Sequence, residues 1–191
     1  MAQPNDFARD PQTALLLIDL QKDFMPAGAM AVPSADQIIP LANRYIKSFS
    51  QHQRPIIATR DWHPPNHCSF KEQGGPWPPH CIAGTPGAEF ADELELPDNL
   101  WLVSKGTDPE HESYSGFDHN DLAKQLSAQG IKHLLVGGVA TDYCVLHSVN
   151  DALRQGFAVT ILQNMVKAVN VQYGDGKNAL ALMQEKGAKL R

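Results

Sequence analysis

The stretch Ala14-Leu-Leu-Leu-Ile-Asp-Leu20 decides the fold, because it is an unbroken apolar run that ends beside an acid. Such a run is typical of a strand buried on both faces, as in a parallel sheet covered by helices. Residues 21–30 (QKDFMPAGAM) indicate a loop. Ser34 then opens a capping-box pattern, SADQ, and apolar residues recur at helical spacing from Ile38 to Phe49. We therefore expect a buried strand followed by a helix.

The same alternation continues along the chain. Further strands are expected at residues 55–59, 100–103, 133–137 and 157–162, and further helices at residues 121–129, 142–155 and 176–186. Residues 187–191 are expected to form a frayed edge strand. Strands that alternate with helices predict an α/β fold, a single domain over residues 1–191 with three α/β/α layers and a mainly parallel central sheet.

Composition narrows the class of protein. The 191 residues are 42% hydrophobic and 19% charged, which excludes intrinsic disorder and suits one domain. The net charge is −5 and no basic run occurs, so neither nucleic acid nor an anionic membrane is an expected partner. No apolar run approaches the roughly 20 residues that span a bilayer, and the polar N-terminus does not resemble a signal peptide. Three cysteines without a CxxC pair favour a reducing cytoplasm.

Reactive residues follow the predicted strands directly. In a parallel sheet, sites form beyond the carboxyl ends of the strands. Asp19, Asp61 and Lys105 each stand at such an end, and so does the segment of residues 136–144 (VGGVATDYC). We therefore expect these residues to converge at one edge of the sheet.

Cys144 is the candidate nucleophile, because it lies in the first turn of the helix expected after the fourth strand. Free backbone N–H groups and the helix dipole favour a thiolate there. Asp19 would take and return a proton, and Lys105 would hold both charged partners. The alternatives are a small buried core cysteine and an Asp–Lys pair at the sheet edge.

A metal site is predicted in a proline-rich loop at about residues 61–99, which holds seven of the 14 prolines. Asp61 and His63 stand two apart, so in extended chain they point to the same face. His80 would be a third ligand, and His67 either a fourth or a supporting residue. Zinc, iron(II) or manganese would suit one such site. In a rival arrangement Cys68 and Cys81 join His67 and His80 in a structural zinc site, which is disfavoured because adjacent residues point to opposite faces.

Five motifs together resemble the nicotinamidase branch of the isochorismatase-like cysteine hydrolase family. They are LLLIDLQKDFMPAGAM, TRDWHPPNHCSF, WPPHCIAGTPGAEF, KG with YSGF downstream, and GGVATDYCV. The resemblance runs from about Ala14 to Gly187. It implies hydrolysis of nicotinamide, and of pyrazinamide, to the carboxylate and ammonia through a cysteine thioester, in NAD salvage.

The same resemblance implies roles for particular residues. It implies a triad of Asp19, Lys105 and Cys144, and one divalent metal ion held by Asp61, His63 and His80. It places an oxyanion hole at the amides of Ala140 and Cys144, beside a cis Val139–Ala140 peptide bond. The substrate pocket that it implies is formed by Phe24, Trp77, Tyr114 and Val139.

Three other functions stay open at this point. A related amidase acting on carbamoyl or maleamate-type substrates would share the triad, but would leave the DxH and WPPH motifs unexplained. A vinyl-ether hydrolase is disfavoured by the cysteine. A non-enzymatic metal- or thiol-responsive binding module would use Cys68, Cys81 and Cys144 as sensors. A homo-oligomer is compatible with all of these.

Overall fold

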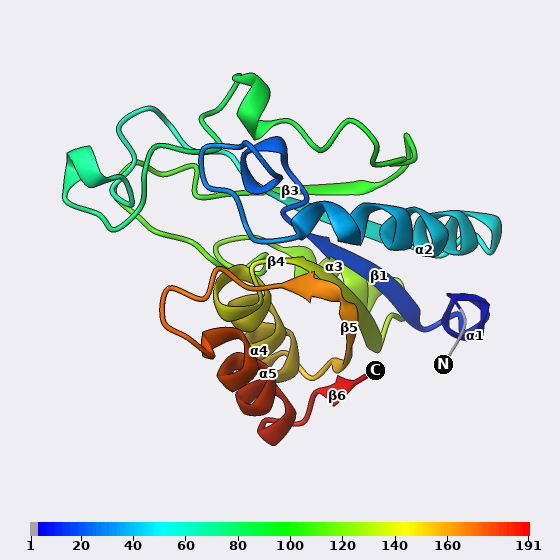
Figure 1. Ribbon diagram of the computed structural model, residues 1–191. Helices are drawn as coiled ribbons and strands as arrows, with labels where there is room; N and C mark the ends of the chain where they lie inside the picture. Colours follow the sequence, from blue (N-terminus) through cyan, green and yellow to red (C-terminus); the bar gives the residue numbers. More distant parts are fainter. Residues whose placement is uncertain (1–3) are drawn as a thin grey trace.

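A computed structural model describes residues 4–191 and has three layers, with helices on both faces of a six-stranded sheet (Figure 1). The strand order is β3-β2-β1-β4-β5-β6, and every neighbouring pair is parallel. The strands are β1 (Thr13–Ile18), β2 (Ile56–Asp61), β3 (Trp101–Lys105), β4 (His133–Val139), β5 (Ala158–Lys167) and β6 (Lys189–Leu190). The expected α/β/α fold is confirmed. Residues 1–3 of the expected domain lie outside the described residues, and its boundaries stay a prediction.

The helices are α1 (Pro4–Ala8), α2 (Ile39–Gln51), α3 (Leu122–Ala128), α4 (Leu146–Arg154) and α5 (Asp175–Glu185). Two cores explain the fully apolar pattern of β1. Leu15 and Leu17 belong to the core under α1 and α2, whereas Leu16 and Ile18 belong to the core under α3, α4 and α5. Burial on both faces of the sheet therefore follows directly from the unbroken run in the sequence.

The direction in which strands are added to the sheet reverses at β1, and this reversal positions the site. The chain moves outward from β1 to β2 and β3, then returns to pair β4 with the other side of β1. Ile18 pairs with Gly138, and Asp61 pairs with Lys105, so the carboxyl ends of four strands lie level. Such a switch point opens a crevice at the carboxyl edge of an α/β sheet.

Local structure departs from the sequence expectations in three places, the first being β5, which was expected to end at residue 162 and continues to Lys167. Ser34 makes no capping hydrogen bond and has a left-handed backbone (φ 60°), because a 3₁₀ turn over Ala35–Ile38 precedes α2. The expected capping box is therefore wrong. The helix expected at 142–155 begins instead as a π-helical turn, Thr141–Val145, and becomes regular only at α4.

The proline-rich loop occupies residues 62–100 between β2 and β3. Its only regular pieces are two 3₁₀ turns, Lys71–Gln73 and Pro86–Ala88. The loop covers the carboxyl edge of the sheet (Figure 1). Within residues 4–191, no helix has the length and hydrophobicity needed to cross a bilayer.

Candidate active site and metal centre

Asp19, Lys105 and Cys144 meet beyond the ends of β1, β3 and β4. The Lys105 ammonium lies 2.8 Å from Asp19 Oδ2 and donates to the Cys144 sulfur at 3.3 Å. All three side chains are buried, with relative exposures of 0%, 3% and 6%. The structure thus brings together the three residues expected to form the triad, and their catalytic roles remain proposals.

The Asp19 carboxylate is held by the neighbouring strand. The Thr59 hydroxyl, on β2, donates to Asp19 Oδ1 at 2.6 Å. Asp19 Oδ2 has the Lys105 ion pair but receives no well-aligned hydrogen bond. Burial raises the pKa of Asp19, while Lys105 and Thr59 pull it down. Sequence reasoning missed Thr59, because only the β1–β2 register reveals the contact.

The environment of Cys144 corrects one expectation. Burial raises the pKa of the Cys144 thiol well above its usual value, although Lys105 acts in the opposite direction. Burial therefore works against the thiolate that the helix start was expected to favour. A buried thiol needs a nearby base before it can act as a nucleophile, and the Asp19 carboxylate is a group close enough to be considered for that role.

Asp61, His63 and His80 form a buried group whose potential ligand atoms all lie within 4.8 Å of one another. His63 Nδ1 donates to the Gly106 carbonyl at 2.9 Å, and His80 Nδ1 donates to the Pro78 carbonyl at 2.8 Å. Because a carbonyl only accepts, each Nδ1 carries a proton, and Nε2 is the nitrogen left to face an ion. Two oriented imidazoles and one carboxylate fit a divalent ion such as zinc, with positions left for water or substrate.

The electrostatics of this group suit a cation. Burial opposes charge on Asp61, but Lys105 and His63 outweigh it and lower the pKa of Asp61 far below its usual range. Burial also disfavours charge on His63, but Asp61 reverses that effect and raises the pKa of His63. Burial lowers the pKa of His80. The ionised Asp61 therefore attracts positive charge into the group, and a metal ion would use the same attraction.

His67 lies beside this group and supports it. Its ring packs on His63 with centroids 4.2 Å apart. Nδ1 contacts the Ser69 hydroxyl at 2.7 Å and Nε2 contacts the His111 carbonyl at 3.2 Å, so neither nitrogen is left for an ion. We therefore propose for His67 the supporting role, one of the two that the sequence left open.

Lys105 joins the triad to the metal group, and Gln21 holds the backbone of Asp61 in place. The Lys105 ammonium also donates to Asp61 Oδ1, so one cation serves both carboxylates. Gln21 accepts from the Asp61 amide at 2.7 Å and donates to the Asp61 carbonyl at 2.7 Å and to the Ala88 carbonyl at 2.9 Å. Gln21 follows Asp19 by two residues, and this spacing was the signal that could have revealed it.

Aromatic side chains stand beside the nucleophile. The Trp77 indole N–H donates to the Tyr114 hydroxyl at 2.9 Å, and burial raises the pKa of Tyr114 to about 12, so this phenol stays neutral. Tyr143, which the sequence analysis did not select, meets Trp77 edge-on at 4.9 Å. Phe24 packs on His80 at 5.7 Å. These rings link the loop, the metal group and the turn that carries Cys144.

The turn around Cys144 has unusual backbone geometry. The Val139–Ala140 peptide bond is cis, as the resemblance implied. The amides of Tyr143 and Val145 both donate to the Ala140 carbonyl at 3.1 Å, and the second bond has the π-helical spacing. Val139 is fully buried in the core under α2. An oxyanion hole at Ala140 and Cys144, and a substrate contact at Val139, remain proposals.

The rival structural zinc site finds no support. Among residues 4–191, the groups able to hold an ion include neither Cys68 nor Cys81. Burial raises the pKa of Cys81 and disfavours the thiolate that zinc requires. No role is assigned to these two cysteines.

Comparison with known proteins extends these observations. An isochorismatase domain model matches residues 13–191. A nicotinamidase of Escherichia coli K12 is 36% identical, with 94% of each chain covered. A pyrazinamidase of Pyrococcus horikoshii solved with zinc is 48% identical and superposes with a TM-score of 0.90, covering 95% of this chain and 99% of that one. An L. infantum protein solved with nicotinate is 32% identical, with a TM-score of 0.86 over 95% and 93% of the two chains.

Proposed function

The chain belongs to the isochorismatase family, and on that premise we propose that it hydrolyses nicotinamide, and pyrazinamide, to the corresponding carboxylate and ammonia. One observation carries the proposal: a buried Cys144–Asp19–Lys105 cluster shares Lys105 with an Asp–His–His group. The similar E. coli protein is a nicotinamidase, and the similar P. horikoshii structure is a pyrazinamidase with zinc. The activity is that of an amidohydrolase acting on a linear carboxamide.

Acylation begins with proton transfer from the Cys144 thiol to Asp19. The sulfur then attacks the carboxamide carbon, and the amides of Ala140 and Cys144 stabilise the developing oxyanion. Asp19 returns the proton to the amine nitrogen, so that the C–N bond breaks and ammonia leaves a thioester on Cys144. Lys105 holds the two reacting groups and balances the carboxylate charge.

Deacylation uses the same carboxylate. Asp19 removes a proton from water, which attacks the thioester carbon, and the thiol is regenerated as the carboxylate product leaves. Asp61, His63 and His80 would hold a zinc, iron or manganese ion, which would supply a Lewis-acidic position for the ring nitrogen of the substrate. Phe24, Trp77, Tyr114 and Val139 are proposed to contain the ring.

The decisive experiment is ammonia release from nicotinamide by the purified protein, before and after chelator treatment. We expect turnover by the zinc-loaded protein, with pyrazinamide as a second substrate. Activity only toward N-carbamoyl or maleamate substrates would indicate the related amidase. No activity at full metal loading would indicate a binding module. A cytoplasmic place in NAD salvage is part of the proposal, supported by three free cysteines among the described residues.

A further inference from the structure

A second cluster of metal-ligating side chains lies on the loop between β3 and α3. His111 Nε2 is 3.1 Å from Asp118 Oδ2, and His119 Nε2 is 3.4 Å from Asp118 Oδ1. The two imidazoles meet edge-on with centroids 4.6 Å apart. The potential ligand atoms of the three residues all lie within 4.8 Å of one another. Nothing in the catalytic scheme above uses these side chains.

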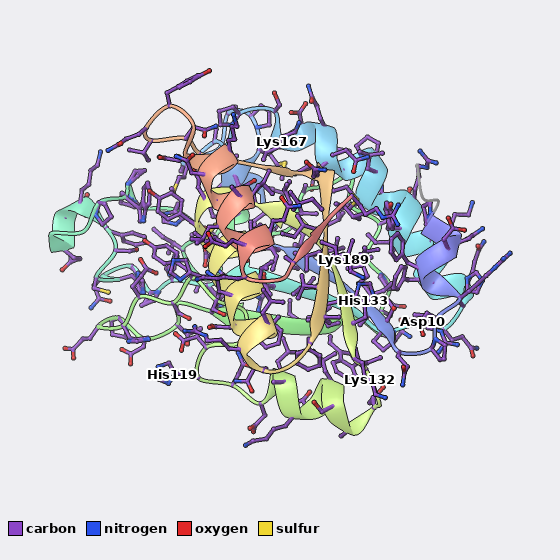
Figure 2. All side chains as sticks on the ribbon, turned by 90° about the horizontal axis from the view of Figure 1, so that it is seen from below. Asp10, His119, Lys132, His133, Lys167 and Lys189 are labelled. Atoms are coloured by element: carbon purple, nitrogen blue, oxygen red, sulfur yellow. The ribbon has the colours of Figure 1, made fainter. Side chains whose placement is uncertain are left out.

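The cluster is exposed to solvent and therefore open to an ion. His111 and His119 have side-chain exposures of 49% and 74%, and Asp118 is 31% exposed. Figure 2 shows His119 projecting at the rim of the molecule, near the loop that leads into α3. A cavity of about 390 Å³ is lined by all three residues and by Asp108. The open volume leaves room for the water ligands that complete a surface metal site.

The charge of the surrounding segment favours a cation. Residues 106–121 contain no lysine or arginine. They contain five acids, namely Asp108, Glu110, Glu112, Asp118 and Asp121, of which Asp121 is paired with Lys124. A run of one charge sign raises the local concentration of counter-ions, here of cations. The two imidazoles add the nitrogen ligands that an acidic cluster alone would lack, and these select borderline metals over calcium and magnesium.

The spacing of the donor atoms matches such a metal. With zinc–ligand distances of about 2.0–2.1 Å, two ligands of a tetrahedral site are about 3.3 Å apart. The two contacts of Asp118 reach different carboxylate oxygens, Oδ2 at 3.1 Å and Oδ1 at 3.4 Å, and each histidine–oxygen pair lies close to that separation. One ligand atom from each of the three residues lies within 4.8 Å of the other two, so side-chain rotations that shorten these separations bring all three onto one ion. We propose that His111, Asp118 and His119 form a second, surface binding site for zinc or a similar divalent transition metal.

This outer site is separable from the inner one. His111 supports the inner group only through its main-chain carbonyl, which contacts His67 Nε2 at 3.2 Å. Substitution of the His111 side chain leaves that carbonyl in place. The proposed outer site can therefore be removed while Asp61, His63 and His80 are kept, and the reverse also holds.

The test is zinc stoichiometry of the full-length protein, measured by equilibrium dialysis against buffered zinc and elemental analysis. Wild type should bind two zinc ions per chain, the second more weakly than the first. The double variant His111→Gln/His119→Gln should bind one, and Asp118→Asn should weaken the second ion at least tenfold. Asp61→Ala should also bind one ion, because it keeps the outer site.

Glu110→Gln is the matched control, because it removes one acid of the same segment without touching the three ligands. It should retain two zinc ions. The first zinc ion retained by the double variant shows that this variant has folded. The proposal is overturned if wild type never exceeds one zinc ion per chain, if the double variant still binds two, or if Glu110→Gln loses the second ion as completely as Asp118→Asn does.

Discussion

Gly106→Ala should release the inner metal, although the substituted residue is not a ligand. Gly106 follows β3, and its carbonyl accepts the hydrogen bond from His63 Nδ1. Its backbone is left-handed, with φ +62°, and a methyl group built on it would overlap the imidazole of His63. A single added carbon therefore disturbs the orientation of the His63 ring without removing any ligand.

The size of the effect follows from the geometry. The added Cβ would lie 2.3 Å from His63 Cε1 and 2.5 Å from His63 Nδ1, whereas ordinary contact begins at 3.4 Å. The ring must therefore retreat by about 1.1 Å. Metal–ligand distances tolerate only about 0.2 Å, and loss of the partner that orients a ligating histidine typically costs about 10–100-fold in metal affinity. We expect a loss in that range.

Gly130→Ala is the matched control, because Gly130 also has a left-handed backbone (φ +75°) but nothing within 4 Å of an added Cβ. Both variants should lose roughly 1–3 kcal/mol of stability from backbone strain. Competition with a zinc chelator should then show weakened binding of the tighter zinc ion in Gly106→Ala alone. Wild-type affinity in Gly106→Ala, or an equal loss in both variants, would refute the proposed role of the His63–Gly106 contact.

Three further predictions concern the reacting groups. Cys144→Ala should reduce kcat at least about 10⁴-fold while the tighter zinc ion stays bound, and loss of that ion would contradict the proposed separation of nucleophile and metal group. Asp61→Ala should show weaker zinc binding and a higher KM, whereas an unchanged zinc affinity would remove Asp61 from the ligands. Thr59→Val removes a hydrogen bond that lowers the pKa of Asp19, so the acidic limb of the kcat profile should move to higher pH. Thr59→Ser, which keeps the hydroxyl, should leave that limb in place.

The fold, and the convergence of the strand-end residues at one edge of the sheet, could be predicted from the sequence. Buried strands leave an apolar signature, and a parallel sheet brings their carboxyl ends to one edge. Asp19, Asp61, Lys105 and Cys144 could thus be selected without coordinates. The place of His80 needed the resemblance or an assumption about the loop, because His80 stands 19 residues after Asp61 and 25 residues before Lys105, and no periodic signal connects them.

What the sequence could not supply was the pairing of partners across strands. Thr59 becomes important only because β2 lies beside β1 and the two strands share a particular register. The resting state of Cys144 depends on complete burial, which a helix-start argument does not include. The outer cluster was also missed, because His111 and His119 are separated by a turn that brings them onto one carboxylate.

The turn in strand order at β1 divides the chemistry between two parts of the chain. The nucleophile and its cis turn follow β4 on one side of β1, whereas the metal group arises from β2 and the loop of residues 62–100 on the other side. The Lys105 ammonium contacts both Cys144 and Asp61. A related protein could therefore have a different loop in place of residues 62–100, and with it a different substrate, while keeping the turn that carries Cys144.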